Sequence, residues 1–322
     1  MQLPQDRRFT FIGDIHGQAN TLLALLDKLG WKRQGGRRRP SDHEFLVFVG
    51  DLIDRGTSNL QTVETVRELV EQGDALCLMG NHEFNAVHYH TPDPDNPGEY
   101  LRPHIKKNTD QHESVLAELE EQPETGAEML AWFRTLPLAV EHESWRCVHA
   151  CWHPASLEVL ERRGDGWFLD ESAWVQSARR GEPEYHAVET LLKGPEHPLP
   201  GGSYFLDKDG HRREVARIRW WDPAPATLQQ ALLCGSTPGG ANLDRPYENP
   251  HHPGYPADAP PVFFGHYWKE DELGPDRPNV ACLDYRAGMF DKLVAYRLGD
   301  ETALEAGRFV AQPVIDERPG QD

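Results

Sequence analysis

Short apolar runs recur along the chain, and each ends in a polar turn that often contains glycine. Continuous apolar runs of this length are typical of strands that are buried on both faces of a sheet. We therefore predict strands within the following segments: FTFIGD (9–14), EFLVFVGD (44–51), ALCLMGN (75–81), WRCVHA (145–150), PVFFGH (261–266), NVACLD (279–284) and KLVAYRL (292–298).

Helical patterns separate the first three apolar runs. ANTLLALLDKLG (19–30) and NLQTVETVRELVEQG (59–73) repeat their apolar residues with a helical period, and both end on glycine. Glycine in that place is typical of a helix C-terminus. The order strand, helix, strand, helix, strand predicts βαβ units with right-handed crossovers.

Two long segments interrupt this alternation. Residues 84–140 predict a mostly helical insertion, and residues 155–260 a cap-like insertion with a hairpin that turns at Asp209-Gly210. We expect a single domain over residues 1–310 that carries both insertions and frames a substrate cleft with them, followed by a loose tail at 311–322. The arginines at 37–39 are expected in a solvated loop.

Charge and cysteine usage narrow the functional classes. The chain has 322 residues and a formal net charge of −19, which argues against nucleic acid or an anionic membrane as the main partner. An anionic substrate would need local positive charge, which bound cations supply. The five cysteines form no C-x-x-C pair, and no signal-like or membrane-spanning apolar stretch is present. We expect a soluble cytoplasmic protein; its oligomeric state stays open.

Polar side chains with ligand chemistry follow five of the predicted strands. In open α/β sheets, ligands bind beyond the carboxyl ends of the strands, so these side chains are expected to converge. Their oxygen and nitrogen atoms suit manganese, iron or zinc, and the lack of cysteine among them disfavours a structural zinc site. The strand-end residues are Asp14, His16, Asp51, Asp54, Arg55, Asn81, His82, His149 and His266.

So many carboxylates and imidazoles around one point would repel or be desolvated without a cation. Taken singly, an aspartate at a strand end is more often a turn or N-cap residue. Five strand ends with ligand-type residues favour a shared site instead. Two metal ions bridged by a carboxylate form the arrangement used for phosphoryl hydrolysis, and Arg55 supplies a bidentate fork for phosphate oxygens.

The motifs that carry these residues resemble those of the calcineurin-like metallophosphoesterases. Within that superfamily they are most similar to the branch of the phosphoprotein phosphatases, the bacterial diadenosine-tetraphosphate hydrolases and the phosphatase module of bacterial polynucleotide end-repair enzymes. The resemblance covers about half the chain and implies an α/β fold, a β-sandwich flanked by helices with a dimetal site at the carboxyl ends of its strands. The motifs are GDIHG (13–17), GDLIDRG (50–56), GNHE (80–83), His149 and GHY (265–267).

The resemblance also implies a role for each residue. Asp14 and His16 would hold one of two divalent ions, Asp51 would bridge both, and the second ion would be completed by Asn81, His149 and His266. Manganese is the first choice of metal, with iron and zinc as alternatives. A metal-activated hydroxide would attack phosphorus. His82 would be the general acid, oriented by Asp54, and Arg55 would bind the phosphate.

Some positions depart from the pattern of the relatives. Trp268 stands where many relatives outside this branch have a second histidine, which favours the phosphoprotein-phosphatase-like branch. LDYRAG replaces the usual closing acid-Thr-Gly segment and leaves the roles of Asp284 and Tyr285 open. Arg245 and Arg286 are both candidates for a second phosphate-binding arginine. The remaining histidines are expected at the surface by default, among them those at 88, 90, 104, 112, 142, 153, 251 and 252.

These expectations together predict hydrolysis of a phosphate ester or phosphoanhydride. The substrate would be a phosphorylated small molecule, a nucleotide or a phosphoprotein. Two activities remain open, a dinucleoside-polyphosphate hydrolase and a serine/threonine phosphatase. A non-catalytic phosphate-binding scaffold is a third interpretation, which the presence of His82, Asp54 and Arg55 disfavours.

Overall fold

The computed structural model describes residues 3–4, 6–35, 37–39, 43–164, 166–206, 212–233, 242–247, 254–270 and 272–318. Two compact units make up the chain: Met1–Leu192 with Pro260–Asp322, and Lys193–Ala259. The predicted turn at Asp209-Gly210 and the histidines at 251 and 252 lie outside the described residues.

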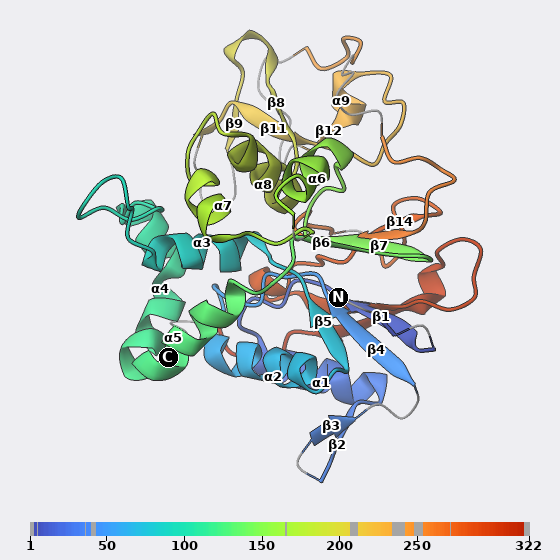
Figure 1. Cartoon of the computed structure of the whole chain (residues 1–322). Helices are drawn as coiled ribbons and strands as arrows, with labels where there is room; N and C mark the ends of the chain where they lie inside the picture. Colours follow the sequence, from blue (N-terminus) through green and yellow to red (C-terminus); the bar gives the residue numbers. More distant parts are fainter. Residues whose placement is uncertain are drawn as a thin grey trace. The chain divides into compact units, whose positions relative to one another are not determined.

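Two sheets form the first unit (Figure 1). In the five-stranded sheet, of order β16-β15-β1-β4-β5, the strands β1, β4 and β5 are parallel, whereas β15 and β16 run antiparallel. In the four-stranded sheet, of order β14-β13-β7-β6, only β6 is antiparallel to its neighbour. The bounds are β1 Arg8–Ile12, β4 Glu44–Phe48, β5 Ala75–Cys77, β6 Ala139–His142, β7 Trp145–Val148, β13 Val262–Phe264, β14 Val280–Cys282, β15 Lys292–Arg297 and β16 Phe309–Pro313.

The main hydrophobic core contains residues from both sheets. Side chains alternate between the two faces of a strand, so Phe9 and Phe11 of β1 lie in this core together with Val47 of β4. The ring of Phe11 stacks on Phe263 of the other sheet, with 3.7 Å between the ring centroids. Each large side chain buried in this way contributes about 1.5–3 kcal/mol to folding.

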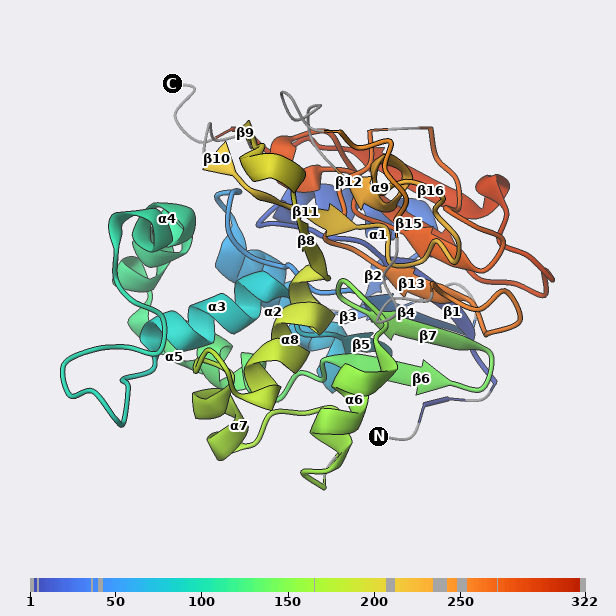
Figure 2. The same ribbon diagram turned by 90° about the horizontal axis from the view of Figure 1, so that it is seen from above.

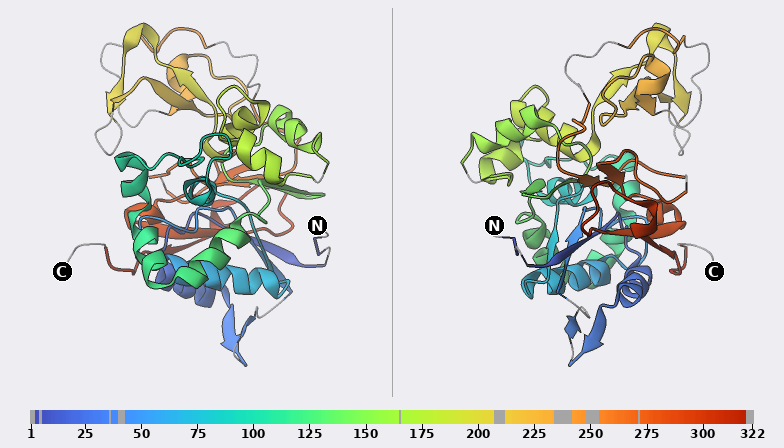
Figure 3. Two further views of the ribbon diagram at one scale, coloured as in Figure 1. Left: turned by 60° about the vertical axis from the view of Figure 1, so that its left-hand side comes forward. Right: turned by 90° about the vertical axis from the view of Figure 1, so that its right-hand side faces the viewer.

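Two helices cover the other face of the five-stranded sheet. Helix α1 (Ala19–Leu29) contacts β15 and β16, and helix α2 (Asn59–Glu71) contacts β5 (Figure 3). The sheet is therefore covered on both faces, which explains why its strands are continuous apolar runs. Gly30 and Gly73, which follow the two helices, both have positive φ, as the predicted C-terminal caps require.

The segment after β5 is helical, as its sequence pattern predicts. Its helices are α3 (Asn81–His90), α4 (Lys106–Glu121) and α5 (Pro123–Phe133); α4 packs on α2 and α5, and α5 packs on α3 (Figure 2). Three more helices follow β7: α6 Pro154–Glu161, α7 Glu171–Gln176 and α8 Pro183–Lys193. The first unit also contains two 3-10 helices, η2 Ala287–Met289 and η3 Ala306–Arg308.

The second unit has a small core of its own. A three-stranded antiparallel sheet of order β12-β11-β8 packs its apolar residues with Leu199, Leu228 and Leu243. Trp220 and Trp221 are also buried. The elements of this unit are β8 Glu196–Pro198, η1 Pro200–Gly202, β9 Phe205–Leu206, β10 Arg212–Arg213, β11 Val215–Ile218, α9 Leu228–Ala231 and β12 Leu232–Leu233.

Two local expectations differ from the structure. The arginines predicted in a loop form β3 (Arg37–Arg39), which pairs antiparallel with β2 (Lys32–Gln34). Two exposed, polar segments can pair in this way because the backbone hydrogen bonds of a strand ladder do not require apolar side chains. Part of the predicted loose tail is ordered: residues 311–313 belong to β16, and Asp316 accepts hydrogen bonds from the first turn of α1. Within the part of the chain that the structure describes, no helix is both long and apolar enough to cross a membrane.

Candidate metal centre

The loops at the carboxyl ends of both sheets meet at one place. The loop after β1 is tied to the loop after β4, because the backbone N–H groups of Ile15 and His16 both donate to the carbonyl of Asp51 at 2.9 Å. A side chain links the two sheets, since His266 N–H donates to Asp14 Oδ2 at 2.9 Å. The predicted strand-end residues are therefore brought together.

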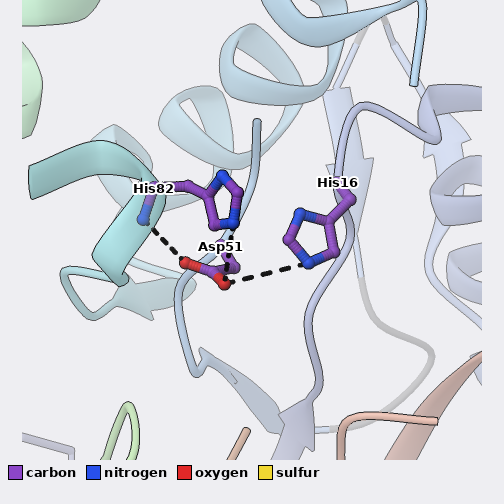
Figure 4. A group of neighbouring side chains, drawn as sticks. All are labelled: His16, Asp51 and His82. Carbon is purple, nitrogen blue, oxygen red and sulfur yellow. Dashed lines mark hydrogen bonds and ion pairs between the residues drawn. The ribbon is translucent and has the colours of Figure 1, made fainter. Parts of the chain in front are cut away.

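Asp51 lies at the centre of this arrangement. The rings of His16 and His82 both face its carboxylate (Figure 4). Its Oδ2 is 3.8 Å from His16 Nε2 and 3.9 Å from His82 Nε2. Its Oδ1 is 3.4 Å from His149 Nε2. Two sets of ligand atoms, each within 4.8 Å of one another, share this carboxylate: His16, Asp51 and His82, and Asp51, His149 and His266.

The ring orientation of two histidines suits metal binding. His16 Nδ1 lies 3.1 Å from the carbonyl of Ile53, and His149 Nδ1 lies 2.8 Å from the carbonyl of Val49. A carbonyl only accepts, so each Nδ1 carries a proton, and each Nε2 is turned toward the carboxylate of Asp51. Such anchoring of the second ring nitrogen is typical of histidines that ligate metals. Asn81 Oδ1 is 3.1 Å from His149 Nε2 and belongs to the same cluster.

Asp14 and Asp284 form a pair of buried carboxyl groups. Burial, with Asp284 and Asp51 nearby, raises the pKa of Asp14 well above its usual value. Burial also raises the pKa of Asp284. Among the described residues no hydrogen bond reaches Asp14 Oδ1, and a Cβ at Gly265 would lie only 1.8 Å from it. Two adjacent buried carboxyls with an unsatisfied oxygen fit a cation, although Asp14 is outside both ligand sets.

The charges of Asp51 and His16 also favour a cation, whereas burial of His149 is outweighed by the neighbouring Asp51, so that the pKa of His149 is raised. Burial alone would raise the pKa of Asp51, but His149 and His82 outweigh it and hold that pKa well below its usual range. Burial lowers the pKa of His16 well below its usual value, and Arg55 and His82 lower it further. An ionised carboxylate beside a neutral imidazole is a donor pair that suits a divalent metal.

His82 makes a second contact on its other ring nitrogen. Its Nδ1 lies 2.5 Å from Asp54 Oδ2, and both side chains are buried. Burial would raise the pKa of Asp54, but hydrogen bonds from His112 and His82 lower it, so Asp54 is ionised at neutral pH. The predicted pairing of His82 with Asp54 is therefore present in the structure.

The arginines differ in their placement. Arg55 packs its guanidinium over the ring of Trp268, 5.1 Å from the centroid, and a Cβ at Gly288 would come within 2.6 Å of its Cδ. Arg286 forms an ion pair with Glu270 at 2.5 Å. Arg245 belongs to the second unit. Of these arginines, Arg55 alone lies in the loop after β4 that also carries Asp51 and Asp54.

Left-handed backbone conformation is concentrated at this site. Of the seven non-glycine residues with positive φ in the described parts of the chain, five are predicted site residues. Such conformations are costly for residues with a Cβ and cluster at functional sites. The five are His16, Asp51, Asp54, Arg55 and His266, with φ between 52° and 72°.

Comparison with known proteins agrees with this geometry. The family model described as calcineurin-like phosphoesterase matches residues 7–220. The chain belongs to the calcineurin-like phosphoesterase family. Bis(5'-nucleosyl)-tetraphosphatase PrpE of Halalkalibacterium halodurans is 40% identical over 75 residues, 23% of this chain and 30% of that protein. The PrpE protein of a Geobacillus strain is 45% identical over 75 residues, 23% of this chain and 31% of its own length.

Solved structures in the same comparison are more distant. A serine/threonine phosphatase from Saccharomyces cerevisiae aligns with a TM-score of 0.48 and 14% identity, covering 98% of this chain and 82% of its own. A cold-active protein-tyrosine phosphatase from a Shewanella species gives a TM-score of 0.47 and 16% identity, covering 97% and 83%. The matched stretch of the PrpE relatives is under a third of their length, so substrate is not inherited from them.

Membership of the calcineurin-like phosphoesterase family confirms the predicted family and the predicted fold class. The two sheets packed around one core match the predicted sandwich flanked by helices. The roles assigned to single residues stay predictions, supported by the distances between them.

Sequence reasoning missed two residues of this site. Glu83 is fully buried and accepts backbone hydrogen bonds from Asp51, Leu52 and Gly80 at 2.8–2.9 Å, so it ties two ligand-bearing loops together. Its position inside GNHE was a signal that could have found it. His112, expected at the surface, is 5% exposed and contacts Asp54. His88 is also buried rather than exposed, and its Nε2 lies 2.9 Å from the carbonyl of Trp174.

Proposed function

We propose that this protein is a dinuclear-metal phosphoesterase that hydrolyses a phosphate ester or phosphoanhydride. The observation that carries the proposal is the shared position of Asp51, whose two oxygens face separate sets of histidines. A single carboxylate between two sets of donors is the arrangement expected of a bridging ligand.

Six side chains would hold the two ions in this proposal. Asp14 and His16 would bind the first ion, Asp51 would bridge, and Asn81, His149 and His266 would bind the second. Manganese is the first candidate, because a site of oxygen and imidazole donors suits it, and iron and zinc suit the same donors. When bound, such ions lower the pKa of water to make a nucleophile and offset negative charge on the phosphoryl group.

The remaining residues would serve the leaving group and the phosphate. As the bond between phosphorus and the leaving oxygen breaks, the electron pair stays on that oxygen and His82 Nε2 gives it a proton. Asp54 at 2.5 Å from Nδ1 keeps Nε2 directed into the site. Arg55, held over Trp268, would bind phosphate oxygens with its guanidinium fork.

Dinucleoside tetraphosphates are the first substrates to test, because the PrpE relatives are named for that activity. A phosphoprotein or another phosphomonoester is the alternative, since the same set of groups serves either bond. A non-catalytic phosphate-binding scaffold is the third interpretation. His82 and Asp54 in hydrogen-bond contact speak against it, because a scaffold has no use for a positioned proton donor.

The test measures phosphate release with manganese, iron or zinc from three substrates: p-nitrophenyl phosphate, a phosphopeptide and diadenosine tetraphosphate. Elemental analysis of the purified protein gives the number and kind of metal ions per chain. We expect about two ions per chain and metal-dependent hydrolysis. Tight phosphate binding without hydrolysis of any substrate would overturn the proposal in favour of the scaffold.

A further inference from the structure

We propose that His112 is a positioning residue that holds Asp54 in place for His82. His112 lies in α4, far along the chain from the strand-end motifs, yet its Nδ1 is 2.8 Å from Asp54 Oδ1. The other carboxylate oxygen, Oδ2, is 2.5 Å from His82 Nδ1. One carboxylate is thus held between two imidazoles, one on each oxygen.

The two contacts fix the orientation of the carboxylate. Asp54 follows β4 on a loop in left-handed conformation, and a carboxylate held by one hydrogen bond can still rotate about its Cβ–Cγ bond. A donor on Oδ1 removes that freedom and leaves Oδ2 directed at His82. A carboxylate with hydrogen bonds on both oxygens restricts the orientation of the His82 ring more than a carboxylate with one. The aspartate of a serine-protease triad orients its histidine in a similar way.

The far ring nitrogen of His112 is also engaged. His112 Nε2 lies 3.3 Å from His90 Nε2 in α3. Burial lowers the pKa of His90 to about 4, with His112 and His104 nearby, so His90 is neutral at pH 7. A neutral His90 can donate from Nε2 to His112 Nε2, which leaves the proton of His112 on Nδ1. His112 Nδ1–H is therefore the donor in the hydrogen bond to Asp54 Oδ1.

Further contacts hold α4 against the same loop. Glu118 accepts hydrogen bonds from the backbone N–H groups of Asn59 and Leu60 at 2.7 and 2.8 Å, where α2 begins. The side chain of Asn59 in turn accepts from Asp54 N–H at 2.8 Å, and its amide lies 3.3 Å from Ser114 Oγ. Helix α4 thus contacts Asp54 directly through His112 and indirectly through Ser114 and Glu118, which contact the Asn59 side chain that accepts from Asp54 N–H.

This inference rests on the proposed function, because it assigns a partner to the proposed general acid. The kinetic test compares p-nitrophenyl phosphate, whose leaving group needs little protonation, with phenyl phosphate, whose leaving group needs more. In the manganese-loaded full chain, His82→Ala should lower kcat on phenyl phosphate about 100-fold, and less on p-nitrophenyl phosphate. His112→Ala should show the same leaving-group dependence with a loss of about 10-fold on phenyl phosphate and little change in KM.

Two further variants separate positioning from folding. His112→Asn keeps a donor near the place of Nδ1 and should recover most of the lost kcat. His104→Ala removes a histidine of the same insertion that bonds the carbonyl of Tyr89 at 2.7 Å, and it should leave both substrates unaffected. Equal losses on the two substrates in His112→Ala, or no recovery in His112→Asn, would overturn the inference.

A second measurement does not depend on activity. In ¹⁵N-histidine NMR spectra, the hydrogen-bonded Nδ1–H of His82 should exchange faster with solvent in His112→Ala and stay protected in His112→Asn. An unchanged His82 signal in His112→Ala would overturn the inference. Failure of the proposed function looks different: His82→Ala would then show no leaving-group dependence, whereas the exchange of the His82 proton would still respond to His112.

Discussion

The strand-end loops and helix α4 contribute to one site in different ways. The loops after β1, β4 and β5 carry their functional residues in short motifs, and the residues are joined by backbone hydrogen bonds such as those from Ile15 and His16 to Asp51. Helix α4 contributes His112 and Glu118, which reach the site through side chains alone. In the proposed function, the loops would supply the metal ligands and the proton donor, and α4 would hold the loop that carries Asp54.

Because of this difference, we expect substitutions in the loops to lower turnover strongly and substitutions in α4 to lower it only in part. A ligand shared by two metal ions has no substitute, whereas a supporting helix is one of several contacts on the same loop. Substitutions in the loops should therefore act on metal content and turnover, and substitutions in α4 should act on turnover and stability with the metals retained.

The largest effect is expected from Asp51→Asn. The change removes the charge that both sets of histidines face, so we expect loss of bound metal and a fall in kcat of at least about 1,000-fold. Elemental analysis and phosphate release measure the two effects. Asp27→Asn, at an exposed aspartate that pairs with Arg38, is the matched control. If Asp51→Asn kept both metal ions, the assignment of Asp51 as the bridging ligand would be wrong.

His82→Ala should come second. We expect a fall in kcat of about 100-fold with both metal ions still bound, because the proposed role of His82 is proton transfer. The structure makes this a sharp test, since His82 Nε2 lies 3.9 Å from Asp51 Oδ2 and belongs to one of the two ligand sets. Metal analysis decides the matter, and loss of an ion would assign His82 to the metal ligands instead.

Glu118→Ala should have a smaller effect and act mainly on stability. Glu118 caps the first turn of α2 from another helix, and loss of a helix cap costs about 1 kcal/mol. Urea unfolding monitored by circular dichroism measures the change, with exposed Glu121 of the same helix as the control position. If Glu118→Ala lowered kcat more than His112→Ala does, α4 would act through α2 rather than through Asp54.

The smallest effect is expected at Asp93, in the loop between α3 and α4. A hydrogen bond from Arg179 is the main reason why the pKa of Asp93 lies below its usual value. The ionised form therefore stabilises the fold above the unfolded-state pKa of about 3.9, and the contribution is lost as pH falls through the lower folded-state pKa. Asp93→Asn should cost about 0.5–1 kcal/mol at neutral pH.

Urea unfolding of metal-free protein at pH 7, 5, 4 and 3 checks this prediction. The difference in unfolding free energy between wild type and Asp93→Asn should be constant down to about pH 5 and should shrink below about pH 4. Asp95→Asn is the control, because Asp95 is an exposed partner of the same arginine. A difference that grew as pH fell would contradict the predicted direction of the pKa shift.

Local patterns predicted the strand-end residues and most of the elements around them. Apolar runs and helical periodicity can be read from short stretches of sequence. The strands β1, β4 and β5 and the helices between them could therefore be predicted from the sequence. His112 could not, because its contact with Asp54 depends on how α4 packs on α2. Asp284 stayed open for a similar reason, since only the packing of two sheets places it beside Asp14.

The left-handed backbone at His16, Asp51, Asp54, Arg55 and His266 limits how this centre can be transferred. Copying the five side chains onto another scaffold would not reproduce it, because an ordinary β- or α-region backbone would aim them elsewhere. A designer would have to transplant the loops with their dihedral angles and with a buried carboxylate in the role of Glu83. What must be transferred to another protein is the backbone conformation of these loops, together with the side chains that they carry.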